Sequence, residues 1–279
     1  MKSSKHILII SSWFPTNAHP FLGNFVEYQS ILLASIYKVT FLRLLPDENL
    51  IKSEGKEELN FLDIFYKKSK NPFITRSNKK KAIINALKNL DSVDLIHAHI
   101  SYPDGWLFRL VKKKLNKPLV LTEHASYYSP NFKWSLLMKY DILKTLKVAD
   151  VVLSVSTFLA NDILHKFPFV KLNIVGNPVD ITRFNIKDKQ TEVFNFLHVS
   201  TLDKVKNVDG IIEAFIEVNK KKSNTKLTII SDEDYKFYQE KVRLIGLEGS
   251  IVFFGPVNHT EMNHYFSNAD CLIMNSHYE

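Results

Sequence analysis

The chain has 279 residues, which exceeds the usual size of one domain and favours two. Its hydrophobic fraction of 45% is ordinary for a globular protein, and its single cysteine excludes an internal disulfide framework. No apolar run approaches the roughly 20 residues that span a bilayer, and the run at residues 7–10 is too short for a signal peptide. We therefore expect a cytoplasmic protein in which Cys271 is a small buried core residue.

The formal net charge of +8 calls for either a solvated basic surface or an anionic partner. Lysines cluster at residues 79–81, 112–114 and 220–222. The simpler interpretation is that these are solvated helix ends. The alternative is an anionic membrane surface, which would place the protein peripherally on the inner face of the membrane. Nucleic acid is not expected as a partner, because the clusters lack interleaved arginines and aromatic residues.

Short β-rich runs alternate with amphipathic helical patterns, which predicts parallel sheets covered by helices. In the first half we expect strands at residues 6–11, 39–44, 95–98, 119–122, 151–155 and 172–175. Helices are expected at residues 24–34, 80–90, 105–115, 136–147 and 157–167. The intervening stretch 46–77 is polar and is predicted to be irregular.

The periodicity lapses after residue 180 and then restarts. We expect strands at residues 194–199, 227–230, 251–254 and 271–274, with helices at 208–219, 235–245 and 261–266. The predicted fold class is therefore α/β, with two Rossmann-like, doubly wound parallel-sheet domains. The first covers residues 1–186, a linker covers 187–193, and the second covers 194–279.

The last predicted strand bears on the completeness of the second domain. Residues 271–274 are uniformly apolar, as in a strand buried on both faces, and the fourth strand of the six-stranded doubly wound order is central. A chain that ends at Glu279 would leave this strand at an exposed edge. We therefore expect the second domain to be incomplete relative to a longer parent protein.

The turn from Val199 to Asn207 is the first candidate for chemistry, because doubly wound sheets bind ligands at the carboxyl ends of their strands. A helix start offers free N–H groups and a positive dipole, and Lys206 adds a full charge, a combination that suits a pyrophosphate. No glycine lies between His198 and Asp209, so the dinucleotide fingerprint of dehydrogenases is absent. A lysine that merely faces solvent is the alternative.

Three further candidates follow predicted strands. His97 and His99 lie on one face of a strand end, but no other ligands have recognisable metal spacing, so no metal site is expected. His124 comes just after the next strand, where it can bind a sugar hydroxyl or a phosphate in a cleft between domains, or serve as a structural histidine. Glu279 is a carboxylate that can reach sugar hydroxyls or a developing positive charge, with a solvated terminal residue as the alternative.

Taken in order, these pieces resemble the group 1 glycosyltransferases, retaining enzymes with the GT-B architecture of two Rossmann-like domains. The matching segments are D-L-I-H-A-H with P-D-G at 94–105, P-L-V-L-T-E-H at 118–124, A-D-V-V-L-S-V-S at 149–156, G-N-P-V-D with F at 176–184, F-F-G at 253–255, and A-D with S and E at 269–279. Each piece alone is weak evidence, whereas their order and spacing across the chain are specific.

The resemblance implies metal-independent transfer without a cofactor. A sugar would pass with retained anomeric configuration from a nucleotide-diphosphate donor to a cell-surface polysaccharide or a lipid-linked acceptor. The second domain would hold the donor, with Lys206, Thr201 and the helix start at Asn207 at its diphosphate. The transferred sugar would contact His124 and Glu279 as catalytic residues, and Gly23 would let the backbone approach it closely. The acceptor side or cleft would include His99, Glu123 and Asn177.

Four departures from the family pattern keep other functions open. Thr201 stands where the family usually has arginine, Pro178 where it has glycine, and residues 231–233 where it has G-D-G. The second glutamate of the E-x7-E motif would lie beyond residue 279, so we expect this chain itself to be inactive. Nucleotide-sugar epimerisation and a non-catalytic binding or pairing subunit remain as alternatives, and Thr201 favours the latter.

Overall fold

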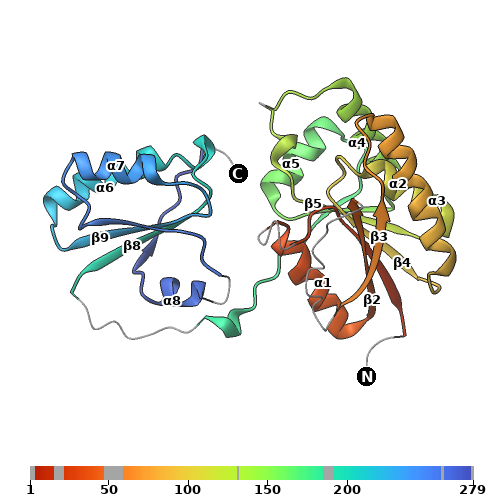
Figure 1. Ribbon diagram of the computed structural model, residues 1–279, viewed down its shortest axis with the longest axis horizontal. Helices are drawn as coiled ribbons and strands as arrows, with labels where there is room; N and C mark the ends of the chain where they lie inside the picture. Colours follow the sequence, from red (N-terminus) through yellow and green to blue (C-terminus); the bar gives the residue numbers. More distant parts are fainter. Residues whose placement is uncertain are drawn as a thin grey trace. The chain divides into compact units, whose positions relative to one another are not determined.

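The computed structural model describes residues 4–15, 22–46, 59–130, 132–184, 192–258 and 261–277. The chain divides into two compact units, Met1–Val179 and Asp180–Glu279, and each is a parallel sheet with helices packed on it (Figure 1). The predicted α/β class with two Rossmann-like domains is confirmed. Residues 187–191 of the predicted linker lie outside the described residues.

The first unit is built on a seven-stranded parallel sheet with the order β3-β2-β1-β4-β5-β6-β7. Its strands are β1 (His6–Ile10), β2 (Lys38–Pro46), β3 (Asn60–Tyr66), β4 (Leu95–His99), β5 (Leu119–Glu123), β6 (Val151–Ser154) and β7 (Leu172–Ile174). All five residues of β1 are buried, as expected for a strand with sheet neighbours on both sides and helices on both faces.

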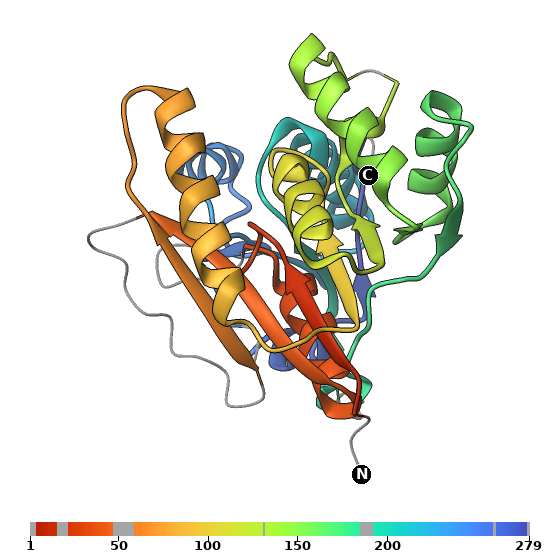
Figure 2. The ribbon, with the colours of Figure 1, turned by 90° about the vertical axis from the view of Figure 1, so that its right-hand side faces the viewer.

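Two layers of helices cover this sheet. They are α1 (Asn24–Ile36), α2 (Pro72–Ala86), α3 (Gly105–Leu115), α4 (Leu136–Val148) and α5 (Thr157–Lys166). Ile7 and Ile9 pack with α1, whereas Leu8 and Ile10 belong to the larger core formed with α2 to α5, so the strand's alternation divides the core into two layers. Figure 2 shows α2, α3 and α4 (orange, yellow and light green) side by side on their face of the sheet.

The prediction of an irregular segment over 46–77 is wrong for its described part, which contains β3 and the first turn of α2. Asp63 interrupts the apolar pattern of β3, but the register with β2 places it opposite Arg43, whose Nε and Nη2 donate to the carboxylate at 2.6 and 2.8 Å. Helix α2 begins at Pro72, where the missing N–H costs nothing, and the side chain of Asn71 accepts from the Phe73 N–H at 2.9 Å.

The second unit has a four-stranded parallel sheet with the order β10-β9-β8-β11. Its strands are β8 (Phe194–Val199), β9 (Thr225–Ile230), β10 (Ile251–Phe254) and β11 (Cys271–Leu272), and its helices are α6 (Val208–Lys221), α7 (Lys236–Leu244) and α8 (Met262–Ser267). The core lies between one sheet face and the helices α6 and α7, with Phe215 and Val242 among its buried members. The fourth strand pairs with the first, as the predicted doubly wound order requires.

The expectation of a buried Cys271 is wrong, because both residues of β11 are exposed. The strand pairs with β8 through Cys271–Phe196 and Leu272–Leu197, and within the described residues no strand pairs with its other edge. An apolar sequence predicts burial only where neighbouring elements cover both faces of the strand. Across the described ranges, no helix is both long and apolar enough to cross a lipid bilayer.

Candidate functional site

Three histidines and one glutamate gather at the carboxyl edge of the first sheet, where β4 and β5 lie side by side. The Nε2 of His97 lies 2.8 Å from the hydroxyl of Thr122, and the His97 and His99 rings are 4.4 Å apart between centroids, so the two imidazoles share a face as predicted. The Nδ1 of His99 lies 3.1 Å from the Nε2 of His124, whose ring stacks on Phe25 of α1 at 4.3 Å. A continuous chain of rings therefore links β4, β5 and α1.

These histidines are neutral at physiological pH. Burial lowers the pKa of His97 to about 4 and that of His124 to about 3, and the proximity of His97 contributes to the lowered pKa of His124. Burial, together with the two neighbouring imidazoles, holds the pKa of His99 well below its ordinary value. Neutral imidazoles can hydrogen-bond to hydroxyl groups but offer no positive charge to a phosphate. No cluster of metal-ligating side chains occurs in the part of the chain that the structure describes.

Two buried ring nitrogens of this cluster, Nε2 of His99 and Nδ1 of His124, have no hydrogen-bond partner among the described residues. In the neutral pair, one proton occupies the bond between the rings. If His99 donates it, its Nε2 is an acceptor and His124 carries a donor at Nδ1; if His124 donates it, the roles reverse. The pair therefore always leaves one donor and one acceptor unsatisfied, a costly arrangement that a ligand's hydroxyl groups could satisfy.

Glu123 is fully buried at the end of β5, and burial raises its pKa to about 7. Its Oε1 accepts from the Ser101 N–H at 3.0 Å and from the Tyr128 hydroxyl at 2.8 Å, and its Oε2 accepts from the Tyr127 hydroxyl at 3.4 Å. Ser101 follows Ile100, whose φ of 64° is unusual for a β-branched residue. Glu123 thus fixes the loop that follows β4, a structural use that its position beside His124 in the sequence does not reveal.

Gly23 lies in the loop between β1 and α1, close to the chain of rings. It has a φ of 70°, and a Cβ placed on it would lie 2.4 Å from the backbone carbonyl carbon and oxygen of Trp13. Both the conformation and the contact require glycine. Because α1 starts at the next residue and its Phe25 stacks on His124, the structure brings Gly23 and His124 to the same neighbourhood.

In the second unit, the predicted turn after β8 contains a short 3-10 segment, Lys204–Lys206, before α6 starts. Asp203 organises this turn, because its Oδ1 accepts from the N–H groups of Val205 and Lys206 at 2.8 and 3.2 Å and its Oδ2 accepts from the Thr201 hydroxyl at 2.7 Å. Asn207 adopts a left-handed conformation (φ 49°) and caps α6 by accepting from the Gly210 N–H at 3.4 Å. Thr201, Lys206 and Asn207 are therefore brought together.

The half-buried Lys206 adds a positive charge to this turn. The hydrogen bond from Thr201, and to a smaller extent the backbone N–H groups of Lys206 and Val205 and the charge of Lys206, lower the pKa of Asp203; burial, and to a smaller extent Lys206, lowers that of His198. His198 is itself buried, with Nε2 at 2.7 Å from the Ser200 hydroxyl and Nδ1 at 2.8 Å from the Ile273 carbonyl oxygen. The positive charge at this strand end suits an anionic ligand.

An acidic side chain reaches the same turn from the loop after β9. The Oε2 of Glu233 accepts from the Leu202 N–H at 3.2 Å, and the Ser231 hydroxyl accepts from the Glu233 N–H at 3.1 Å. This is the segment that departs from the family's G-D-G. An anion bound at Leu202 would have to displace the glutamate.

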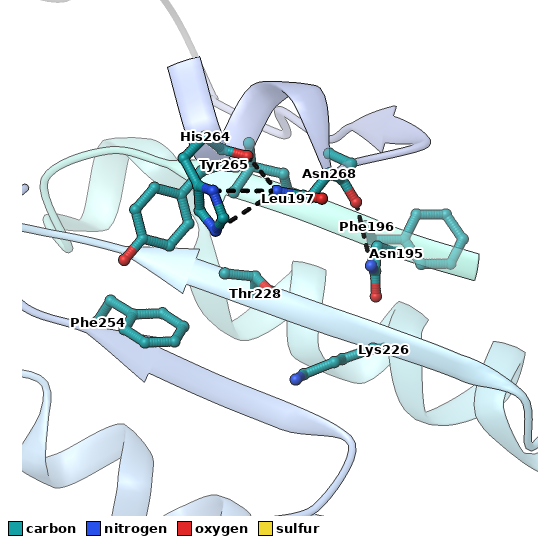
Figure 3. A pocket seen from close by; sticks show the side chains of 10 residues that line it. Asn195, Phe196, Leu197, Lys226, Thr228, Phe254, His264, Tyr265 and Asn268 are labelled. Carbon is teal, nitrogen blue, oxygen red and sulfur yellow. Dashed lines mark hydrogen bonds between the residues drawn. The ribbon is translucent and has the colours of Figure 1, made fainter. Parts of the chain in front are cut away.

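The remaining predicted residues are not part of either cluster. Asn177 is exposed near the end of the first unit, and Glu279 lies outside the described residues. A groove of about 180 Å³ opens on the sheet face of the second unit that carries α8 (Figure 3). It is lined by polar side chains such as Asn195, Lys226 and Thr228 together with Phe254 and Tyr265, and Lys206 is not among its lining residues.

Comparison with known proteins gives a consistent assignment across the chain. Residues 48–183 match the model described as Glycosyltransferase Family 4, and residues 180–279 match the model described as Glycosyl transferases group 1. The alpha-monoglucosyldiacylglycerol synthase of Streptococcus pneumoniae is 22% identical in an alignment of length 230 that covers 72% of this chain and 52% of that protein. The enzyme of the same name from Acholeplasma laidlawii is 25% identical in an alignment of length 227 that covers 69% of this chain and 55% of the relative. The chain spans about half the length of the curated relatives it matches.

Solved structures agree on the fold. A glycosyltransferase from Rickettsia africae has a TM-score of 0.70 at 19% identity, with 98% of this chain and 73% of that chain covered. A TarM variant from S. aureus, solved with alpha-GlcNAc-glycerol, Fondaparinux and UDP, has a TM-score of 0.70 at 12% identity, covering 99% of this chain and 82% of that chain. Since the two family models together match residues 48–279, the chain belongs to the group 1 glycosyltransferases and has their GT-B fold.

Proposed function

We propose that the protein to which this chain belongs transfers a sugar, with retained anomeric configuration, from a nucleotide-diphosphate donor to a lipid-linked or polysaccharide acceptor, without a metal ion. The observation that carries the proposal is the turn after β8, in which Lys206 lies at the start of α6. The named relatives support a lipid acceptor, because two of them are glucosyldiacylglycerol synthases. Family membership, the single cysteine and these relatives favour a reaction at the cytoplasmic face of a membrane.

In this proposal the second unit binds the donor. Lys206 and the first N–H groups of α6 hold the diphosphate, whereas Thr201 stands in place of the family's arginine and uses its hydroxyl to donate to Asp203 within the turn. Negative charge grows on the diphosphate as its bond to the sugar breaks, so a fixed ammonium group stabilises the transition state more than the ground state. Glu279 would contact the sugar, by the family pattern alone.

The first unit then contributes hydrogen bonds to sugar hydroxyls. His99 and His124 present one donor and one acceptor in a buried site, and Gly23 permits close approach of the backbone beside them. Because the imidazoles are neutral, we assign them to positioning the sugar and not to binding its phosphates. Asn177 remains an acceptor-side candidate from the family pattern.

A non-catalytic sugar-nucleotide-binding subunit is the second candidate. It is favoured by Thr201 at the arginine position and by Glu233, whose carboxylate occupies the Leu202 N–H where a donor phosphate could otherwise bind. No feature of the described residues favours epimerisation of a nucleotide sugar over transfer.

Product analysis separates these functions. The full-length protein would be incubated with radiolabelled UDP- and GDP-sugars, diacylglycerol or glycolipid acceptors, and EDTA, with Lys206→Ala as the inactive control and Lys204→Ala as the matched active one. Transfer predicts a labelled lipid or saccharide with the donor's anomeric configuration. A changed sugar without acceptor would indicate epimerisation, and donor binding without any product would indicate a binding subunit; either result would contradict the proposal.

A further inference from the structure

Large apolar side chains are exposed at the carboxyl edge of the first sheet, on the face that carries α2 to α5. They are Phe73 and Ile74 at the start of α2, and Phe132, Leu136 and Leu137 just before and at the start of α4, and together we call them the apolar rim. Phe73 is 81% exposed, Leu136 89% and Leu137 66%. Single exposed apolar residues are common, whereas several at one edge mark an interaction surface.

The topology places both groups of the rim at one edge. Helix α2 follows the carboxyl end of β3 and α4 follows that of β5, and in a parallel sheet these ends share an edge. Figure 2 shows the N-terminal ends of α2 and α4 (orange and light green) at the top of the sheet. The same helices pack into the core through Ile83, Met138 and Ile142. The rim residues are not part of this core.

The charges around the apolar rim are almost entirely positive. Residues 67–80 contain no Asp or Glu, and residues 132–144 contain one acid, the buried Asp141, which pairs with Arg109. The exposed cations beside the rim are Lys67, Lys68, Lys70, Arg76, Lys133 and Lys139. By contrast, two lysines of the predicted clusters are engaged elsewhere: Lys79 is 3.9 Å from Asp104, and Lys112 pairs with Asp150.

The rim also continues into the candidate acceptor side. The Tyr127 hydroxyl donates to Glu123, the Tyr127 ring lies 6.3 Å from that of Phe132, and the Trp134 Nε1 donates to the Tyr127 carbonyl oxygen at 2.6 Å. A chain of contacts therefore runs from Glu123, at the end of β5, to the segment just before α4.

We propose that the apolar rim and its lysines dock this unit on the surface of an anionic lipid bilayer. The apolar side chains enter the boundary between headgroups and acyl chains, and the lysines remain at the headgroup phosphates. Acidic headgroups complement the charge of the surface, and contact at this edge brings a membrane-embedded acceptor beside His99 and His124. The significance of the surface for acceptor delivery rests on the proposed function, whereas the docking itself does not.

Vesicle co-sedimentation tests the proposal in the absence of any donor, so its result is independent of whether transfer occurs. The chain should bind vesicles of phosphatidylglycerol and phosphatidylcholine, and binding should fall steeply with salt and be lost on phosphatidylcholine alone. Leu136→Ser/Leu137→Ser should weaken binding by about tenfold or more, whereas Leu32→Ser/Ile36→Ser, a pair about half-exposed on α1 of the opposite sheet face, should leave it unchanged.

Charge is tested with two matched triple variants that remove the same net charge. Replacing Lys67, Lys68 and Lys70 by Gln should weaken binding by about fivefold per lysine, whereas the same change at residues 220–222, a solvated cluster of the second unit, should have little effect. Equal losses in both, or equal binding to neutral and anionic vesicles, would overturn the proposal. So would self-association in sedimentation velocity that the Leu136/Leu137 variant abolishes, without vesicle binding, because the rim would then join two copies of the chain.

Discussion

His99 and His124 are joined by a hydrogen bond of 3.1 Å between the Nδ1 of one ring and the Nε2 of the other. The bond links β4 to the residue that follows β5, and both rings are held neutral by burial. The tautomer of one histidine therefore dictates that of the other. A sugar hydroxyl that hydrogen-bonds to either ring would therefore fix the tautomer of both.

We predict that His124→Ala lowers kcat by about tenfold or more, the expected cost of leaving the partner nitrogen and a substrate hydroxyl unpaired. Donor affinity should change little, because the diphosphate is assigned to the second unit. Steady-state kinetics and nucleotide titration on the full-length protein measure the two effects separately. His165→Ala, which removes an exposed histidine of α5, is the control. Unchanged turnover in the His124 variant would leave the ring with a structural role alone.

Glu123 should make stability depend on pH. An ordinary glutamate has a pKa near 4.5, whereas burial raises that of folded Glu123 to about 7. The folded protein therefore keeps a proton that the unfolded chain releases, and this contribution to stability is complete below pH 4.5 and is lost as pH rises through 7. The neutral histidines act in the opposite direction, losing stability as pH falls below 6.5.

Urea unfolding of the wild type and of Glu123→Gln isolates the glutamate's share, because both proteins contain the same histidines. Relative to the variant, the wild type should lose up to about 3 kcal/mol of unfolding free energy between pH 4.5 and pH 8. Glu217→Gln, which changes an exposed glutamate, should show no comparable trend. A difference that stays constant with pH would show that Glu123 is ionised in the folded protein throughout this range.

Gly23→Ala should destabilise the first unit by roughly 1 to 3 kcal/mol, because the methyl group meets the Trp13 backbone at a positive φ. Gly176→Ala in the same unit is the matched control, since its Cβ would have no neighbour within 4 Å and its φ is not positive. Thermal or urea unfolding of the two variants gives the comparison. Equal stabilities would mean that the loop after β1 moves to accommodate a side chain.

Most of the fold follows from periodicity in the sequence. The strands Phe194–Val199 and Ile251–Phe254 and the helix Gly105–Leu115 have the predicted bounds, because each is an uninterrupted pattern. Strand β3 was hidden by Asp63, whose partner Arg43 becomes apparent only from the register of the sheet. The start of α2 had a readable signal, Asn71-Pro72, which combines an N-cap residue with proline at the first helical position.

The site residues can likewise be predicted from the sequence, whereas the contacts between them cannot. Position after a strand identifies His99, Glu123, His124 and Lys206, since the carboxyl ends of parallel strands are local features of the sequence. Their partners are not local. Phe25 reaches His124 from α1, and Glu233 reaches Leu202 from the loop after β9, so neither contact has a spacing that the sequence displays. Tyr127 and Tyr128, which follow Glu123 within five residues, are a nearby signal of the buried Glu123 network.

The measurement that tests the account most directly is isothermal titration of UDP and of GDP into the full-length protein in EDTA. At least one nucleotide should bind, and Lys206→Ala should weaken it by about tenfold or more, because a charge-assisted contact to the diphosphate contributes roughly 1.5 to 3 kcal/mol. Lys204→Ala, which removes an exposed lysine from the same turn, should retain wild-type affinity. Equal affinity in the wild type and Lys206→Ala, or binding that requires a divalent cation, would contradict the assignment of the donor site to this turn.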